Sequence, residues 1–273
     1  MSVPDIVLPI PDQGVAWRFL RNRFKSPIAP AGRISQAKYE VSSEFSGTTE
    51  IELALVLPRQ STIMSFPPRY SHAPAPSHAS VMGRMRAGEL ARSNIRQALE
   101  AARGCPDAWY RVQALAYVAE AAPDERTLLS VLEEAAKESA RCHDAYGTVA
   151  VMAWPIAVAV RRDTRAFAER ERARCLDLAP TVQPHNSRAY ALEVLWTACH
   201  AVDPAFARPI WDRIRALCHP DRCWRAARLW RHVAEAVEEQ HPGAGGSIIR
   251  AMPEGKARRR LERRYWPALR DRT

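Results

Sequence analysis

The sequence lacks an apolar run long enough to cross a membrane. The longest, from Val149 to Val160, has twelve residues, whereas a transmembrane helix needs about 20. The first fourteen residues also lack the basic stretch and apolar run of a secretory signal, and they contain three prolines and two aspartates. We therefore expect a cytoplasmic protein without a membrane segment, whose six cysteines are reduced thiols.

The motifs that would indicate catalysis or metal binding are also missing. The glycine-rich stretch 243–247 has no Walker-type lysine followed by serine or threonine. Cysteine precedes histidine at 142–143, 199–200 and 218–219, and Cys223 lies near the last pair, but no second clean pair completes a four-ligand zinc site. The sequence therefore predicts no catalytic residue, no metal ion and no cofactor.

Positive charge is concentrated at the two ends of the chain. Residues 1–87 contain 10 basic and 6 acidic side chains, residues 88–219 contain 17 of each, and residues 220–273 contain 13 and 7. A neutral middle argues against a uniformly cationic nucleic-acid binder. The pattern predicts a neutral scaffold with a basic C-terminal appendage.

Composition also divides the chain near residue 88. Residues 1–87 hold 10 of the 21 prolines, and the stretch 58–80 is rich in Pro and Ser without apolar periodicity. This predicts a largely disordered N-terminal region and linker, in which residues 15–24 could form a short helix and residues 51–57 a strand. A chain that begins at Met85 is then expected to fold as stably as the full chain.

From residue 88 onward the sequence is rich in Ala, Leu, Arg and Glu, and short turn signals divide it. Aspartate stands at most of the expected helix starts, where its side chain can accept the free backbone N–H groups. These aspartates are Asp107, Asp124, Asp144, Asp163, Asp203 and Asp221. The expected helices are 88–103, 107–121, 124–140, 144–161, 163–178, 186–201, 203–218, 221–239, 247–252 and 254–270.

An internal repeat is the strongest signal. DAWYRVQAL at 107–115, DAYGTVAVM at 144–152, PHNSRAYAL at 184–192 and DRCWRAARL at 221–229 align at offsets of 37, 40 and 37 residues. Apolar columns at spacings of 3, 4 and 3 mark one face of a helix. One column, expected to be buried, contains Leu115, Met152, Leu192 and Leu229.

A second helix is expected after each copy, so each unit is an antiparallel helix pair that buries its apolar face only by stacking. The repeat predicts an all-α, right-handed α-α superhelix, a solenoid of about four to five helix pairs over residues 88–252. Residues 88–103 would form a leading half unit, and residues 253–273 a basic C-terminal helix.

The stretch ALEAARGCPDAWYRVQALAYVAEA, residues 98–121, resembles the degenerate helix-pair repeats of bacterial α-solenoids, in the HEAT-like and tetratricopeptide-like group. The period is longer than the tetratricopeptide's 34 residues, and that family's Trp–Leu–Gly–Tyr spacing is absent. The resemblance implies a non-enzymatic module, such as a scaffold, adaptor, regulator or immunity-type protein, that binds an unknown protein or peptide on its concave face. It carries over no catalytic residue.

Two sets of side chains are candidates for that contact. On the second helix at 203–218, Trp211 with Arg208, Arg213 and Arg215 could line the concave face. In the repeat, Arg111, Thr148, Arg188 and Arg225 form one column. The arginines are expected either to pair with an aspartate four residues earlier or to form a ladder for an acidic ligand.

Nucleic-acid binding is the alternative function. HEAT-like alkylpurine DNA glycosylases show that such a solenoid can hold DNA, although their catalytic Asp and Trp have no counterpart that can be matched here. The basic and aromatic residues suited to phosphates and bases cluster near the C-terminus. They are Lys256, Arg258, Arg259, Arg260, Arg263, Arg264 and Trp266. The competing interpretation is a solvated helix that covers the end of the solenoid.

Overall fold

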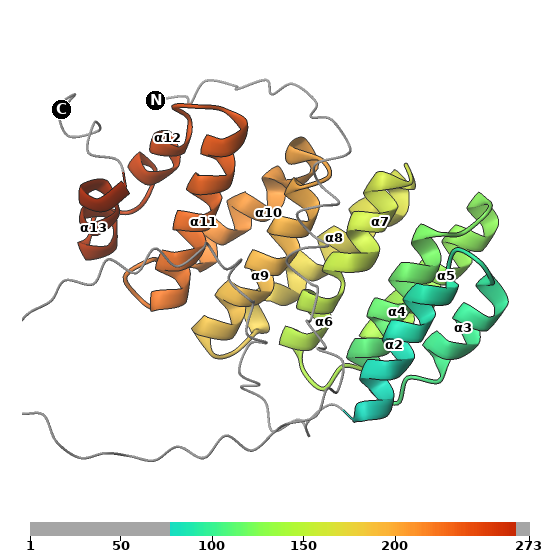
Figure 1. The fold of residues 1–273 in the computed structure, drawn as a ribbon. Coiled ribbons are helices and arrows are strands. Elements are labelled where there is room, and N and C mark those ends of the chain that lie inside the picture. The colour runs from blue at the N-terminus through green and yellow to red at the C-terminus, as the bar shows by residue number, and fades with distance from the viewer. Residues whose placement is uncertain (1–76, 266–273) are drawn as a thin grey trace, which may run out of the picture. The chain divides into compact units, whose positions relative to one another are not determined.

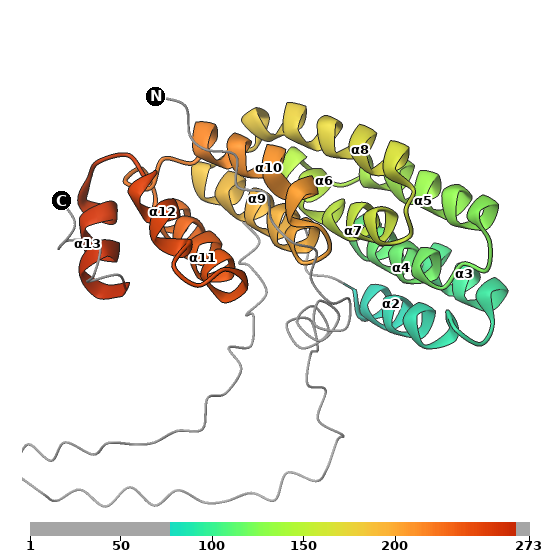
Figure 2. The same ribbon diagram turned by 90° about the horizontal axis from the view of Figure 1, so that it is seen from above.

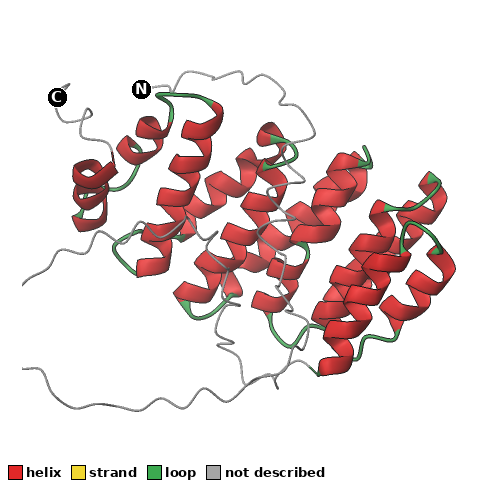
Figure 3. Cartoon of the chain, viewed as in Figure 1, coloured by secondary structure: helices red, strands yellow, loops and turns green. Residues whose placement is uncertain are grey.

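The computed structural model describes residues 77–265. Within this range the chain consists of helices joined by turns, with no strand (Figures 1 and 3). The predicted fold class, an all-α superhelix of stacked helix pairs, is confirmed for these residues. The helix expected at 15–24, the strand expected at 51–57, Trp266 and the disorder expected before residue 77 lie outside the described range.

The helices follow one another as antiparallel pairs. In each pair the first helix is followed by a second that packs back on it, and successive first helices also contact one another. Figure 2 shows α4, α7, α9 and α11 in one layer and α5, α8 and α10 in the other. The pairs are α2 (His78–Leu90) with α3 (Ile95–Arg103), α4 (Ala108–Glu120) with α5 (Glu125–Ser139), α6 (Ala145–Val151) and α7 (Ala153–Arg161) with α8 (Arg165–Leu178), α9 (His185–His200) with α10 (Pro204–Leu217), and α11 (Trp224–Gln240) with α12 (Gly245–Arg250).

The leading unit is a complete pair, which corrects the predicted half unit. The single helix expected at 88–103 is two helices, α2 and α3, and the expected boundary between residues 87 and 88 falls inside α2. Periodicity missed α2 because small residues, rather than an apolar stripe, hold it in place. At Gly83 a Cβ atom would lie 2.8 Å from the Cys105 Sγ, so only glycine allows this approach.

Helix α2 also bonds to the next unit. The Ser80 hydroxyl accepts a hydrogen bond from the backbone N–H of Asp107 at 3.1 Å, and Arg84 Nη1 donates to Gln113 Oε1 at 2.8 Å. A chain that begins at Met85 would lose all of these contacts. The expectation that it folds as stably as the full chain is therefore without a physical basis.

The helix expected at 144–161 is broken at Met152, between α6 and α7. Pro155 lies in the first turn of α7. Because proline has no backbone N–H group, it cannot donate a hydrogen bond to a carbonyl one turn earlier. A proline is a usual cause of such a break. The two short helices together act as the first helix of their unit, and the 3-10 turn η1 (Ala179–Thr181) follows α8.

The repeat columns form the core. Leu115, Met152, Leu192 and Leu229 are each fully buried, as predicted. The column one turn earlier, which runs from Val112 to Ala226, is buried as well. These side chains belong to one continuous apolar cluster that extends from α2 to α11.

Four of the six predicted aspartate caps are confirmed: Asp107, Asp124, Asp144 and Asp203 accept backbone N–H groups at the starts of α4, α5, α6 and α10. Asp163 does not cap α8; it has a φ of 59° and lies in the preceding turn. Asp221 does not cap α11, whose first N–H groups face the Cys223 side chain. The predictions for Asp163 and Asp221 were wrong because the turns before α8 and α11 are longer than the repeat suggested.

Asp221 instead caps a helix that lies far along the chain. Its carboxylate accepts the backbone N–H groups of Lys256 at 3.2 Å and Ala257 at 2.8 Å, at the start of α13 (Lys256–Tyr265). Leu261 of α13 is buried in a small apolar cluster with Trp230 and Met252. The C-terminal helix is thus attached to the end of the stack by the Asp221 cap, by apolar packing of Leu261 and Ala257, and by a hydrogen bond from Arg258 Nη1 to the Met252 carbonyl at 3.4 Å.

Candidate interaction surface

The arginine column ties each first helix to the turn before it. Arg111 donates to the Cys105 carbonyl from Nε at 3.0 Å and from Nη2 at 2.8 Å, and Arg188 Nη2 donates to the Pro180 carbonyl at 2.7 Å. The Thr148 hydroxyl donates to the Ser139 carbonyl at 3.1 Å in the same way. The expected pairs with aspartates four residues earlier are wrong, because these aspartates face backbone N–H groups instead.

Arg225, the last member of this column, has a different environment. It is buried, and its guanidinium carbon lies 4.7 Å from the Tyr190 ring centroid and 4.8 Å from that of Trp224. Within residues 77–265 no carboxylate pairs with it, and its Nε has no hydrogen-bond partner. The faces of two aromatic rings therefore stabilise this cation.

A row of aromatic rings leads to Arg225 along the first helices. Trp109 of α4 packs against Trp154 of α7 and stacks on Tyr146 of α6 with centroids 6.0 Å apart, and Tyr146 lies 6.2 Å from Tyr190 of α9. We call these side chains, together with Arg225 and Trp224, the aromatic row. Its first four rings are half-buried, so it forms part of the core edge and part of the surface.

Trp224, the last side chain of the aromatic row, is the most accessible. It is 57% exposed at the first position of α11, and Met82 is the other large apolar side chain of the described residues that is exposed to a similar degree. Tyr146, in the middle of the row, has a buried hydroxyl without a hydrogen-bond partner in that range. Burial also raises the pKa of this hydroxyl, so it stays protonated and can donate.

Most of the side chains on α10 that were predicted to contact a partner already contact neighbouring side chains. Trp211 is half-buried and meets Trp230 of α11 edge to face, with centroids 4.7 Å apart. Arg213 lies 3.9 Å from an oxygen of Asp177, and Arg215 lies 3.8 Å from one of Asp212. Arg208 is exposed on the same helix. Trp211 therefore acts mainly as a packing residue between α10 and α11.

The Cys–His neighbours do not come together. All six cysteines are free thiols, and the described residues contain no group of three or more metal-ligating side chains. Cys199 is fully buried in the core, the Cys218 carbonyl accepts the indole N–H of Trp230 at 3.0 Å, and Cys223 caps α11. Burial raises the pKa of the Cys218 and Cys175 thiols to about 12, which keeps both protonated.

Two histidines lie on the fourth and fifth first helices, α9 and α11. Glu193 of α9 makes a close contact with the His232 ring of α11. Two turns further along α9, His200 stacks on Trp196 with ring centroids 4.2 Å apart. Burial lowers the pKa of His200 to about 4, and its Nε2 has no hydrogen-bond partner in the described range. His200 is therefore neutral at physiological pH.

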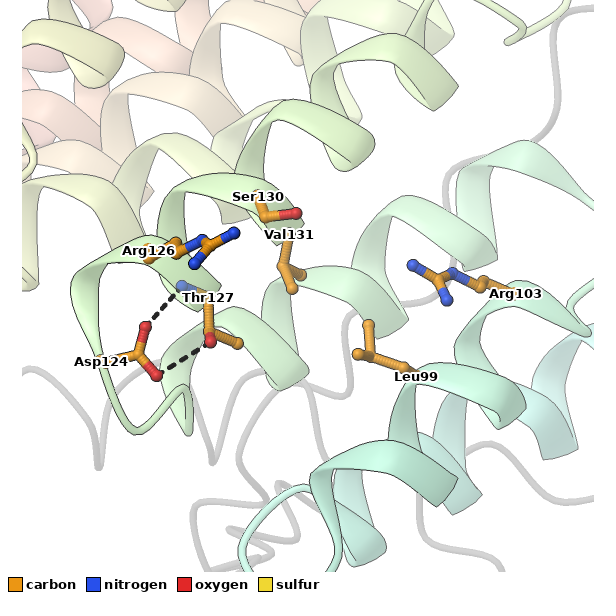
Figure 4. Close-up of a pocket in the computed structure, with 7 residues that line it drawn as sticks. All are labelled: Leu99, Arg103, Asp124, Arg126, Thr127, Ser130 and Val131. Atoms are coloured by element: carbon orange, nitrogen blue, oxygen red, sulfur yellow. Dashed lines mark hydrogen bonds between the residues drawn. The ribbon is translucent and has the colours of Figure 1, made fainter.

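A surface depression with a volume of about 480 Å³ lies between α3 and α5 (Figure 4). Several of its polar groups are already engaged: Asp124 accepts the N–H and the hydroxyl of Thr127, and Arg103 pairs with Glu134 at 2.7 Å. In the glycine-rich turn before α12, the Glu238 carboxylate accepts the N–H groups of Gly243 and Gly245.

Comparison of the chain with protein-family models, with curated proteins and with solved structures found no match. Among residues 77–265, no helix combines the length and the apolar character that crossing a membrane requires. The candidate surface therefore has to be judged from its own side chains.

Reasoning from the sequence did not single out the aromatic row. A signal was present: Trp109 and Tyr146 each stand two residues after a capping aspartate, in equivalent positions of the repeat. Tyr190 and Trp224 stand elsewhere in their units, two residues after and one residue before the arginine column. Only the packing of α6, α9 and α11 brings all of them into one row.

Proposed function

We propose that the protein is a non-enzymatic protein-interaction module, a scaffold or adaptor whose protein partner docks on the aromatic row with Trp224 as its anchor. The single observation that carries the proposal is the exposure of Trp224 next to the buried cation Arg225. Exposed tryptophan costs free energy in water unless a partner covers it. Trp, Tyr and Arg, which make up the row, are also the residues that dominate binding energy at protein interfaces.

The stacked helix pairs support this role because they hold the row rigidly. Each of these first helices is fixed by its buried column, and α4, α6 and α9 also by bonds to the preceding turn, so the rings need little ordering when a partner binds. Of the contacts proposed on α10, Arg208 and Arg215 are exposed. Trp211 is engaged in packing, and Arg213 and Arg215 lie near acidic side chains.

The experiment compares the full chain with its Trp224→Ala and Met82→Ala variants as baits in native lysate. Both side chains are large, apolar and exposed, but they lie on different helices, α11 and α2. We expect a protein that the wild type and Met82→Ala retain and that Trp224→Ala loses. The interaction is then measured with the purified partner, where Trp224→Ala should weaken binding by at least tenfold.

Two outcomes would contradict the proposal. In the first, no protein depends on Trp224 for capture. In the second, both variants reduce capture equally, which indicates general hydrophobic adhesion. Melting curves of the three proteins serve as the control, because truncation of an exposed side chain should leave the fold unchanged.

A further inference from the structure

Helix α13 carries its cations on a single face. Lys256, Arg259, Arg260, Arg263 and Arg264 follow the spacing i, i+3, i+4, i+7, i+8 and are all exposed. We call these five residues the basic stripe. Arg258, which the sequence placed in the same set, is not part of it: its Nε pairs with Glu262 at 2.8 Å, and it is half-buried.

Four of the five charges of the basic stripe are not compensated by a carboxylate of the described residues. Within residues 77–265 no acidic side chain forms an ion pair with Lys256, Arg259, Arg260 or Arg263. Elsewhere on the stack, some exposed arginines have such a partner, as Arg103 has in Glu134 at 2.7 Å, and others, such as Arg92 and Arg96, stand without one among the described residues but are not packed into a stripe of five cations. The stripe thus combines like charges at close spacing, which destabilises an isolated helix and favours binding of an anion.

The fold holds the helix in place despite this repulsion. The Asp221 carboxylate caps its first turn, and Leu261 anchors its opposite face against Met252 and Trp230. Gly255 makes the cap possible, because a Cβ atom at this position would lie 1.8 Å from the Asp221 Oδ2. A basic helix that is fixed before binding loses less entropy when it meets its ligand.

From this geometry we infer that the basic stripe binds the phosphate backbone of a nucleic acid. From residue 256 to 264 it extends about 12 Å at 1.5 Å per residue, which faces about three phosphates of one strand. Four of its five cations are arginines, whose guanidinium groups suit the oxygen geometry of phosphate. The apolar face of α13 already packs on the stack, so none remains for insertion into a lipid surface.

The test measures binding of the full chain to a labelled 25-base-pair duplex of arbitrary sequence between 50 and 300 mM salt. The main variant is the triple change Arg259→Gln, Arg260→Gln and Arg263→Gln. The matched control changes Arg92, Arg96 and Arg126 to Gln, which removes the same charge from exposed positions on other parts of the stack. A single-stranded RNA, polyglutamate and anionic vesicles are offered in parallel.

We expect the triple variant to bind at least tenfold more weakly at 50 mM salt and the control to bind almost as well as the wild type. The slope of log K against log salt should fall by up to about 0.9 for each lost phosphate contact. Gly255→Ala, which keeps every charge but displaces Asp221, should also weaken binding, since it frees the helix from its cap.

Several results would overturn the inference. The wild type could fail to bind any nucleic acid at 50 mM salt, or both triple variants could lose affinity equally, which would indicate net charge alone. Stripe-dependent binding of polyglutamate or vesicles without binding of nucleic acid would assign the surface to an acidic protein or a membrane. An unchanged affinity for Gly255→Ala would refute the role of the cap. The inference is independent of the protein partner proposed for the aromatic row.

Discussion

The middle of the stack and its C-terminal helix are stabilised in different ways. In α4 to α11 every first helix buries its apolar column, and in α4, α6 and α9 an arginine or threonine side chain also bonds to the preceding turn. Helix α13 has a neighbour on one side only, buries Leu261, and depends on a cap from a residue 35 positions earlier. The comparison indicates that substitutions in the core of the stack should lower the stability of the whole fold, whereas substitutions in α13 should act on that helix alone.

Truncation of a core leucine should show the largest difference between the two regions. Leu192→Ala is expected to lower the free energy of unfolding by about 2–5 kcal/mol, because it leaves a cavity between fixed neighbours. Leu261→Ala should cost less and should loosen α13 without lowering the main unfolding midpoint. Urea denaturation, combined with hydrogen exchange of the α13 amides, measures both. Equal loss of global stability would mean that α13 unfolds together with the stack.

Acidification should weaken the middle of the stack through His200. Burial lowers the pKa of this histidine in the folded protein to about 4, below its ordinary value of 6.5. The unfolded chain then takes up a proton as the pH falls below about 6.5 while the folded one does not, so stability is lost between pH 6.5 and 4.

The loss attributable to His200 amounts to as much as about 3 kcal/mol. It is measured as the difference in urea midpoints between the wild type and His200→Gln at pH 7.5, 5.5 and 4.5. The wild type should lose stability relative to the variant as the pH falls, because only the wild type has the titrating group. A difference that stays constant with pH would show that His200 does not contribute.

Removal of a cap should have a smaller effect, which again depends on the region. Asp144→Ala, at the start of α6, is expected to cost about 1 kcal/mol of global stability. Asp221→Ala should cost a similar amount at α13 alone, seen as faster hydrogen exchange of residues 256–264 with an unchanged melting temperature. If Asp221→Ala lowers the melting temperature of the whole protein, α13 belongs to the cooperative unit.

Trp224→Ala should have the smallest effect on stability, within about 0.5 kcal/mol, because the side chain is largely in water. Thermal melting checks this directly. A large loss of stability would mean that Trp224 mainly supports Arg225, and the proposed anchor for a partner would then be a structural residue.

Much of the stack could be predicted from the sequence. The apolar columns identified every first helix from α4 onward and the buried positions within it, since helical periodicity is a local property of the chain. Asp107, Asp124, Asp144 and Asp203 were recognisable as caps for the same reason. Helix α2 escaped detection because it is held by close packing at Gly83 rather than by an apolar stripe.

The candidate sites were less accessible to such reasoning. The basic residues of α13 were visible as a cluster, but the separation of Arg258 from the basic stripe depends on its contact with Glu262. The aromatic row joins side chains from four units whose positions in the repeat differ. The helical spacing of the basic stripe can be read along the chain, but the contact that removes Arg258 from it and the meeting of the rings in the aromatic row cannot.

The sequence alone therefore determined the helix type and the buried faces of the first helices from α4 onward, because each of these depends on residues within a few turns of one another. Tertiary structure decided that Asp221 serves α13 rather than α11, that Arg225 lies between Tyr190 and Trp224, and that Trp224 remains exposed. These outcomes depend on which distant helices meet, and a cap or an exposed ring is defined only once that packing has placed its neighbours.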